Sequence, residues 1–311
     1  MATTIPRAQI ATPTAEASLE EAILRRPPRS FWRDSWERFK RDKLAITGAF
    51  IFLALCVIAL AAPLVSEYVT GYDPNKLNLR DQYARPSPAH PFGADEYGRD
   101  YLTRTVWAGR ISLSIGFLVA IIELTIGVIL GLAAGYYGGW FDDLVQAMTN
   151  VINSIPVLVL LIMIGSMVRL DWPKLAVLLA LFGWTGGTRL VRGQVLSVRQ
   201  RDYVLAARAV GAGNGRIMFS HILPNVFSIV LVLLGFDIVG AMLVESALSF
   251  LGVGVQPPTA TWGNMLSNAL AYTTRDPWLV VFPGLAIAVT VFAIFSLADG
   301  LRDAMDPRLR R

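Results

Sequence analysis

The sequence has few charged residues, a single cysteine and two histidines. Charged side chains make up 16% of its 311 residues, against about 25% in soluble globular proteins. This deficit predicts a protein that is largely surrounded by lipid. Cys56 is alone, which excludes a disulfide framework or a thiolate metal cluster within the chain. His90 and His221 lie far apart in the sequence, so a histidine-rich metal site is not expected.

Six windows are long and apolar enough to cross a membrane as helices. A helix that crosses about 30 Å of hydrocarbon at about 1.5 Å per residue needs about 20 apolar residues. The predicted spans are residues 44–66, 111–135, 144–168, 175–191, 224–245 and 277–298. Pro156 is expected to kink the third span at Ser154–Ile155. The sequence therefore predicts an all-α integral membrane protein whose transmembrane domain covers residues 44–311.

The distribution of basic residues predicts how these spans are oriented. With a cytoplasmic amino terminus, the inner segments contain 19 Lys and Arg and the outer segments contain 9. Because basic residues concentrate on the cytoplasmic side, we expect both termini in the cytoplasm of a cell whose inner membrane holds the protein. Residues 1–26 lack the apolar region of a signal peptide and are expected to form a disordered cytoplasmic tail. Residues 27–43, in which aromatic and basic side chains alternate, are expected to form an amphipathic helix on the lipid surface.

Two local patterns predict packing rather than chemistry. Gly127, Gly131 and Gly135 recur every four residues and would let a neighbouring helix approach the second span closely. The outer segment 67–110 mixes acidic and basic residues and contains several prolines. We interpret most of it as a folded cap on the bundle, with contact to a solute-binding protein as the alternative.

Signatures of nucleotide hydrolysis and of zinc proteolysis are missing. No Gly-x-x-x-x-Gly-Lys-Ser/Thr occurs, so any ATP and Mg²⁺ that drive this protein are expected on partner chains. No His-Glu-x-x-His occurs either, and the predicted topology places His90 and His221 on opposite sides of the membrane. The charge of +5 does not require nucleic acid, because the basic residues flank apolar runs. We expect a non-catalytic chain without a metal or cofactor of its own and without a nucleic-acid partner.

A polar stretch between the fourth and fifth spans is the most informative part of the sequence. It runs Asp202-Tyr203-Val-Leu-Ala206-Ala207-Arg-Ala-Val-Gly211-Ala-Gly213 and reaches Leu223-Pro224 at the start of the fifth span. The stretch is too polar to cross a membrane, and its residues favour a short helix followed by a glycine-rich turn. The small side chains of Ala206 and Ala207 would let another surface approach closely. These features alone also fit an ordinary loop between helices.

This stretch resembles the EAA loop of ABC-importer permeases. The pattern of that loop is Glu-Ala-Ala, three residues, Gly, nine residues, Ile, one residue and Leu-Pro. Matching positions are held by Ala206, Ala207, Gly211, Leu223 and Pro224, while Leu205 replaces the Glu and His221 replaces the Ile. The segments His90–Asp100, Glu245–Gly252 and Asp299–Asp303 resemble the dipeptide/oligopeptide/nickel subfamily in the same order along the chain.

The resemblance implies a type I ABC-importer permease whose coupling helix docks on an ATPase. It also implies four further partners, namely a second homologous permease, two ATP-binding subunits and an extracytoplasmic solute-binding protein. The implied solutes are di- or oligopeptides, with nickel, glutathione or haem as alternatives. An ion-gradient-driven secondary transporter is a further alternative, which inverted repeats would favour; no clear internal repeat is present.

Three carboxylates lie within or near the predicted spans. A charge at the middle of a bilayer costs at least about 2.5 kcal/mol, so each should face protein or water. For Glu123 and Asp237, a translocation-path or gating role and a structural, hydrogen-bonded role are both open. Glu245 lies at the outer interface, where a structural or gating role is favoured over contact with the solute.

Overall fold

The computed structural model describes residues 31–305 of the chain. Within this range the chain is helical and forms no β-sheet. The helices in chain order are α2 (Phe31–Phe39), α3 (Lys43–Leu60), α4 (Ala62–Leu64), α5 (Tyr101–Tyr137), α6 (Gly139–Ser154), α7 (Val157–Met167), α8 (Trp172–Val198), α9 (Asp202–Ala209), α10 (Asn214–Arg216), α11 (Leu223–Phe250), α12 (Trp262–Ala269) and α13 (Trp278–Met305). A wide helical turn, Ile217–Ile222, joins α10 to α11.

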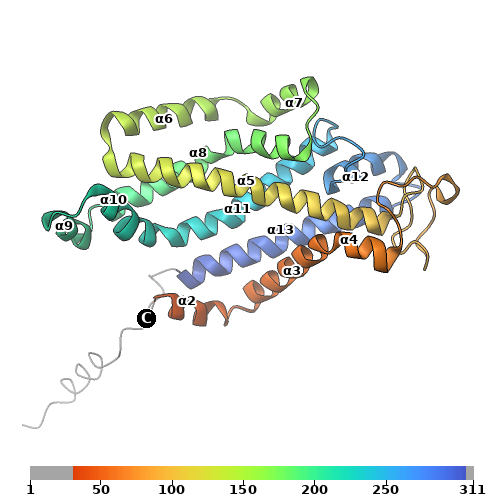
Figure 1. The fold of residues 1–311 in the computed structure, drawn as a ribbon, viewed down its shortest axis with the longest axis horizontal. Helices are drawn as coiled ribbons and strands as arrows, with labels where there is room; N and C mark the ends of the chain where they lie inside the picture. Colours follow the sequence, from red (N-terminus) through yellow and green to blue (C-terminus); the bar gives the residue numbers. More distant parts are fainter. Residues whose placement is uncertain (1–30, 306–311) are drawn as a thin grey trace, which may run out of the picture.

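The long helices lie side by side in one elongated bundle (Figure 1). α5 packs against both α8 and α11, and α13 packs between α3 and α11. The short helices α2, α9 and α10 lie at one end of the bundle, together with the end of α13 (Figure 1). The segment between α4 and α5 lies at the opposite end with α12. This arrangement is the one expected if every long helix crosses the membrane.

Among the described residues, five helices are long and apolar enough to span a membrane on their own. They are α3, α5, α8, α11 together with the turn before it, and α13. α6 and α7 qualify as a pair, which brings the number of candidate spans to six. Large apolar side chains such as Phe50 and Leu60 are exposed on α3, as expected for a helix that faces lipid. The all-α membrane architecture is therefore confirmed.

The third predicted span is broken rather than gently kinked. α6 ends at Ser154, α7 begins at Val157, and their axes differ by 70°. Ile155 and Pro156 between them are both extended. Proline disfavours helical backbone at the residue before it and cannot donate to the preceding turn. The predicted position of the break is confirmed, and its size explains why only the pair together qualifies as a span.

The close approach of α5 and α8 depends on three glycines. A Cβ atom on Gly131 would lie 2.7 Å from the carbonyl oxygen of Thr188, and one on Gly135 would lie 2.7 Å from the Cβ of Val195. A Cβ on Gly127 would lie 3.1 Å from the backbone nitrogen of Thr188. The predicted packing role of this glycine face is therefore confirmed, and α8 is the neighbour. α8 itself is continuous from Trp172 to Val198.

The amino-terminal part of the described chain is a short helix bound to the bundle. α2 is followed by a break at Asp42, whose Oδ1 accepts hydrogen bonds from the backbone N–H groups of Leu44 (2.9 Å) and Ala45 (3.1 Å). This cap begins α3 as a separate helix, so the expected 27–43 helix ends at Phe39. The expected tail, residues 1–26, lies outside the described residues.

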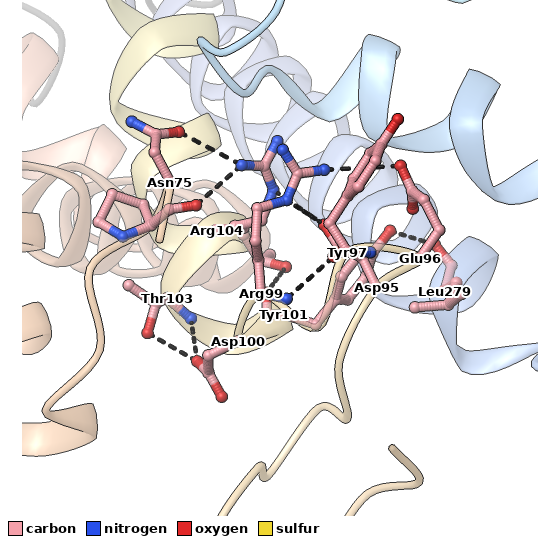
Figure 2. Close-up of polar contacts among 12 residues, drawn as sticks. Asn75, Asp95, Glu96, Tyr97, Arg99, Asp100, Tyr101, Thr103, Arg104 and Leu279 are labelled. Carbon is pink, nitrogen blue, oxygen red and sulfur yellow. Dashed lines mark hydrogen bonds and ion pairs between the residues drawn. The ribbon is translucent and has the colours of Figure 1, made fainter. Parts of the chain in front are cut away.

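The segment before α5 forms a cap that is fixed by buried charges (Figure 2). Asp95 Oδ2 accepts a hydrogen bond from Arg99 Nε at 2.6 Å and lies 3.5 Å from Arg104 Nε. All three side chains are buried. The Tyr101 hydroxyl donates to the carbonyl of Leu279 at 2.5 Å, which ties the cap to α13. The segment is thus folded onto the end of the bundle that lies opposite to α2 and α9 (Figure 1).

The glycine contact predicts a specific stability defect. We expect Gly131→Val to destabilise the purified protein by about 1–3 kcal/mol, because the added side chain cannot fit against α8 without moving it. Thermal unfolding in detergent would measure the loss. Gly193→Val is the matched control, since a Cβ at this helical position meets no atom within 4 Å. Equal melting temperatures for the two variants would contradict the proposed contact.

Candidate functional site

The short helix predicted between the fourth and fifth spans is present as α9, and it ends in a specific turn. α9 begins at Asp202, whose negative charge suits the positive end of the helix dipole. Gly211 follows it with a positive φ of 83°. Its N–H donates to the carbonyl of Arg208 (3.0 Å), and the N–H of Ala212 donates to the carbonyl of Ala207 (3.0 Å). This pair of bonds is a Schellman motif, which favours glycine at this position.

α9 has an inner and an outer face. Val204 is fully buried and Ala207 is nearly so, and both point into the bundle. Tyr203, Leu205 and Ala206 are exposed. The sequence did not distinguish the two alanines, and the structure places Ala206 alone on the outer face. Partial burial raises the pKa of the Tyr203 phenol above its ordinary value.

The remaining residues of the predicted segment lead from α9 into α11. Gly213 precedes α10, and Leu223 and Pro224 form the first turn of α11. Pro224 is tolerated there because the first turn of a helix leaves its N–H groups unpaired. The Asn225 side chain donates to the carbonyl of His221 at 2.7 Å and closes the preceding turn.

Polar contacts bind this segment to the end of α5. The Tyr136 hydroxyl donates to Asn214 Oδ1 at 2.8 Å. The guanidinium of Arg208 lies over the Tyr136 ring, 5.7 Å from its centroid. Arg199 donates to the carbonyl oxygens of Gly135 (2.9 Å) and Tyr136 (3.3 Å). Sequence reasoning missed Tyr136, because nothing in its local sequence indicates a contact with residues 72 and 78 positions away.

A cavity lies between the helices in the middle of the bundle, and two of the three predicted carboxylates line it. Its volume is about 370 Å³. The residues that line it are Glu123, Asn153, Val157, Leu161, Leu179, Phe182, Gly183, Thr185, Gly186, Phe236, Asp237, Gly240, Ala241 and Val244. Several of them, including Asn153 and Gly240, are exposed, so the cavity opens at the side of the subunit. Glu123 from α5 and Asp237 from α11 are thus brought together.

Glu245 lies apart from the cavity and is fully buried. Its carboxylate accepts hydrogen bonds from the hydroxyls of Ser249 (2.8 Å) and Ser112 (3.2 Å). Ser112 Oγ also accepts a hydrogen bond from the N–H of Trp262 at 3.3 Å. This network joins α5, α11 and α12. In residues 31–305, no three His, Cys, Asp or Glu side chains converge in a way that could hold a metal ion.

One ion pair and two asparagine side chains also join α6 to α8. The Arg192 guanidinium donates to both carboxylate oxygens of Asp142, and Arg189 donates to Asn150 Oδ1 at 2.8 Å. Thr185 donates to Asn153 Oδ1 at 3.0 Å, next to the cavity. These contacts hold the broken span in place against the long helix α8.

Comparison with known proteins identifies relatives over the whole length of the chain. Residues 30–86 match the N-terminal transmembrane domain of oligopeptide transport permease C. The chain is 39% identical to the dipeptide transport system permease protein DppC of Bacillus subtilis (strain 168), over 95% of this chain and 92% of that protein. It is 36% identical to the oligopeptide transport system permease protein OppC of the same organism, over 99% of both. It is 37% identical to the glutathione transport system permease protein GsiD of Pectobacterium atrosepticum, over 91% and 93%.

The match over the second part of the chain includes α9 and most of the residues that line the cavity. Residues 127–311 match the family described as the inner membrane component of binding-protein-dependent transport systems. The resemblance inferred from the EAA-like stretch is thereby confirmed. Together with its apolar helices, this match shows a multi-pass inner membrane protein that belongs to the family of binding-protein-dependent transport permeases.

Proposed function

We propose that this chain forms half of the translocation pathway of an ATP-driven importer for di- or oligopeptides. Relatives named for dipeptide and oligopeptide transport support this class of solute. A relative named for glutathione transport supports the alternative cargo glutathione, which is itself a small peptide. Nickel complexes and haem are the alternative cargoes of the same machinery. An extracytoplasmic binding protein delivers the solute to the outer end of the bundle.

The outer face of α9 is the observation that carries the proposed coupling to ATP. Tyr203 and Leu205 expose apolar surface at an end of the molecule that lies beyond the apolar spans. Exposed apolar surface outside lipid favours a protein partner. The small side chain of Ala206 lets that partner approach closely. The partner is an ATPase subunit, which holds ATP and Mg²⁺ and whose closure pushes α9.

A second permease completes the pathway in this proposal. The cavity opens at the side of the subunit, where a homologous chain supplies the missing wall. Two ATP-binding subunits then act on the two coupling helices. Glu123 and Asp237 are the pathway residues of this chain. Glu245 stabilises the contact among α5, α11 and α12. An ion-driven secondary transporter needs no ATPase partner, so the exposed apolar face of α9 does not favour that alternative.

The first prediction concerns the docking surface. We expect Ala206→Glu to reduce peptide uptake to below about a tenth of wild type, because the new charge would be buried against the ATPase without a partner. Co-purification of the ATPase with the tagged permease would measure docking directly. Ala206→Ser is the control, since it adds neither charge nor much volume. Normal co-purification of the Glu variant would rule out this docking face.

A second prediction concerns transmission of the movement to α5. We expect Tyr136→Phe to raise the ATP hydrolysed per peptide transported by about three- to tenfold, which corresponds to the loss of one hydrogen bond to Asn214. Uptake and ATP hydrolysis would be measured on the same proteoliposomes. Tyr137→Phe is the matched control, because Tyr137 is adjacent in sequence, exposed and without this bond. An unchanged ratio in Tyr136→Phe would show that the contact does not transmit movement.

A third prediction concerns the orientation in the membrane. Cys56 is first replaced by Ser, and single cysteines are placed at the exposed positions Lys40 and Tyr68. A membrane-impermeant maleimide should label Tyr68→Cys in intact cells and Lys40→Cys only after permeabilisation, because basic residues keep the Lys40 end inside. The reverse pattern would place both termini outside the cell.

A further inference from the structure

The cavity between α5, α8 and α11 has an unusual distribution of charge. Two carboxylates, Glu123 and Asp237, line it, and none of its lining residues is a Lys, Arg or His. Neither carboxylate forms a hydrogen bond or an ion pair with any residue between 31 and 305. A positive charge from outside the chain would therefore stabilise both.

The backbone of α8 leaves room for one of these carboxylates. A Cβ atom on Gly183 would collide with the carboxyl group of Glu123. The carboxylate consequently lies directly against the α8 backbone and at the edge of the cavity. Glycine at this position lets a long acidic side chain fit between two tightly packed helices. The position of the charge is thus fixed by backbone packing rather than by polar partners.

The rest of the lining indicates what kind of cation fits. No third His, Cys, Asp or Glu of the described chain joins the two carboxylates, so the coordination shell of a bare metal ion would be incomplete. The other walls are mostly apolar, with Val157, Leu161 and Phe182 among them. The volume of about 370 Å³ falls in the range of small-molecule sites. An ammonium group attached to an apolar body would pair with the two carboxylates and pack against the apolar side chains.

We propose that this cavity is a transit site for the ammonium groups of cationic peptides, at the α-amino end and on basic side chains. Glu123 and Asp237 supply the counter-charge, and the apolar wall receives the apolar part of the residue that carries the ammonium group. The inference rests on the proposed peptide transport and specifies which chemical groups of the solute this chain contacts. In this proposal the permease itself selects solutes by their charge. This selection adds to that of the binding protein that delivers the solute.

The test uses the complete transporter, with both permeases, the ATPases and the binding protein, in proteoliposomes. Initial uptake rates of Ala-Lys and Ala-Glu are measured for wild type and for Glu123→Gln/Asp237→Asn. We expect the double variant to transport Ala-Lys at least about tenfold more slowly, because it removes both partners of a desolvated cation. The uptake rate of Ala-Glu should fall less, since the two carboxylates no longer repel its glutamate side chain.

Two further variants separate electrostatics from damage to the fold. Gly183→Ala keeps both carboxylates but displaces that of Glu123, so the Ala-Lys to Ala-Glu ratio should fall in the same direction. Glu67→Gln removes an exposed carboxylate far from the cavity lining and should leave the ratio unchanged.

The outcomes are distinguishable. If the wild-type complex transports neither peptide with ATP, the proposed function fails. If wild type transports both and the double variant keeps the rates and their ratio, the transit site is wrong. An equal fall for both peptides would also overturn it, because a merely structural role lowers both rates alike.

Discussion

The contact between α5 and α8 is the constraint on which the other features depend. Helices in lipid gain little from burying apolar side chains, so close backbone approach has to supply the attraction. The glycine face of α5 permits that approach. Once the register of the two helices is set, Glu123 lies against Gly183 near the middle of the pair. Tyr136 lies at its end, beside the segment that contains α9.

The polar groups within the bundle fall into two kinds, and the difference separates structure from transport. Glu245 is enclosed and bonded to serine hydroxyls, and Asp142 is paired with Arg192. A satisfied network of this kind rigidifies the protein and leaves no capacity for a solute. Glu123 and Asp237 have no such partners among residues 31–305, and both line a cavity. An unpaired charge within the membrane is energetically costly. The two carboxylates beside the cavity are therefore best explained by a ligand that carries the opposite charge.

The sequence predicted which segments enter the membrane better than it predicted how they end. α5 begins ten residues before the apolar window at 111–135, because Asp100 caps a polar first turn that hydropathy does not detect. Pro156 indicated the position of the break in the third span but not its angle of 70°. The roles of Ala206 and Ala207 were indistinguishable, since spacing alone does not reveal which side of a short helix the bundle covers. The convergence of Glu123 and Asp237 required the packing of α5 against α11.

The buried face of α9 explains how movement at one end of the bundle can reach the cavity. Val204 shares a core with Val195 of α8 and with Ile217 before α11, so α9 cannot shift without moving those helices. Protein interiors transmit such displacements because they are closely packed. Tyr136 and Glu123 are separated by 13 residues on one continuous helix, or about 20 Å. In the proposed mechanism, a push on α9 would therefore act on the wall of the cavity through a rigid helix pair.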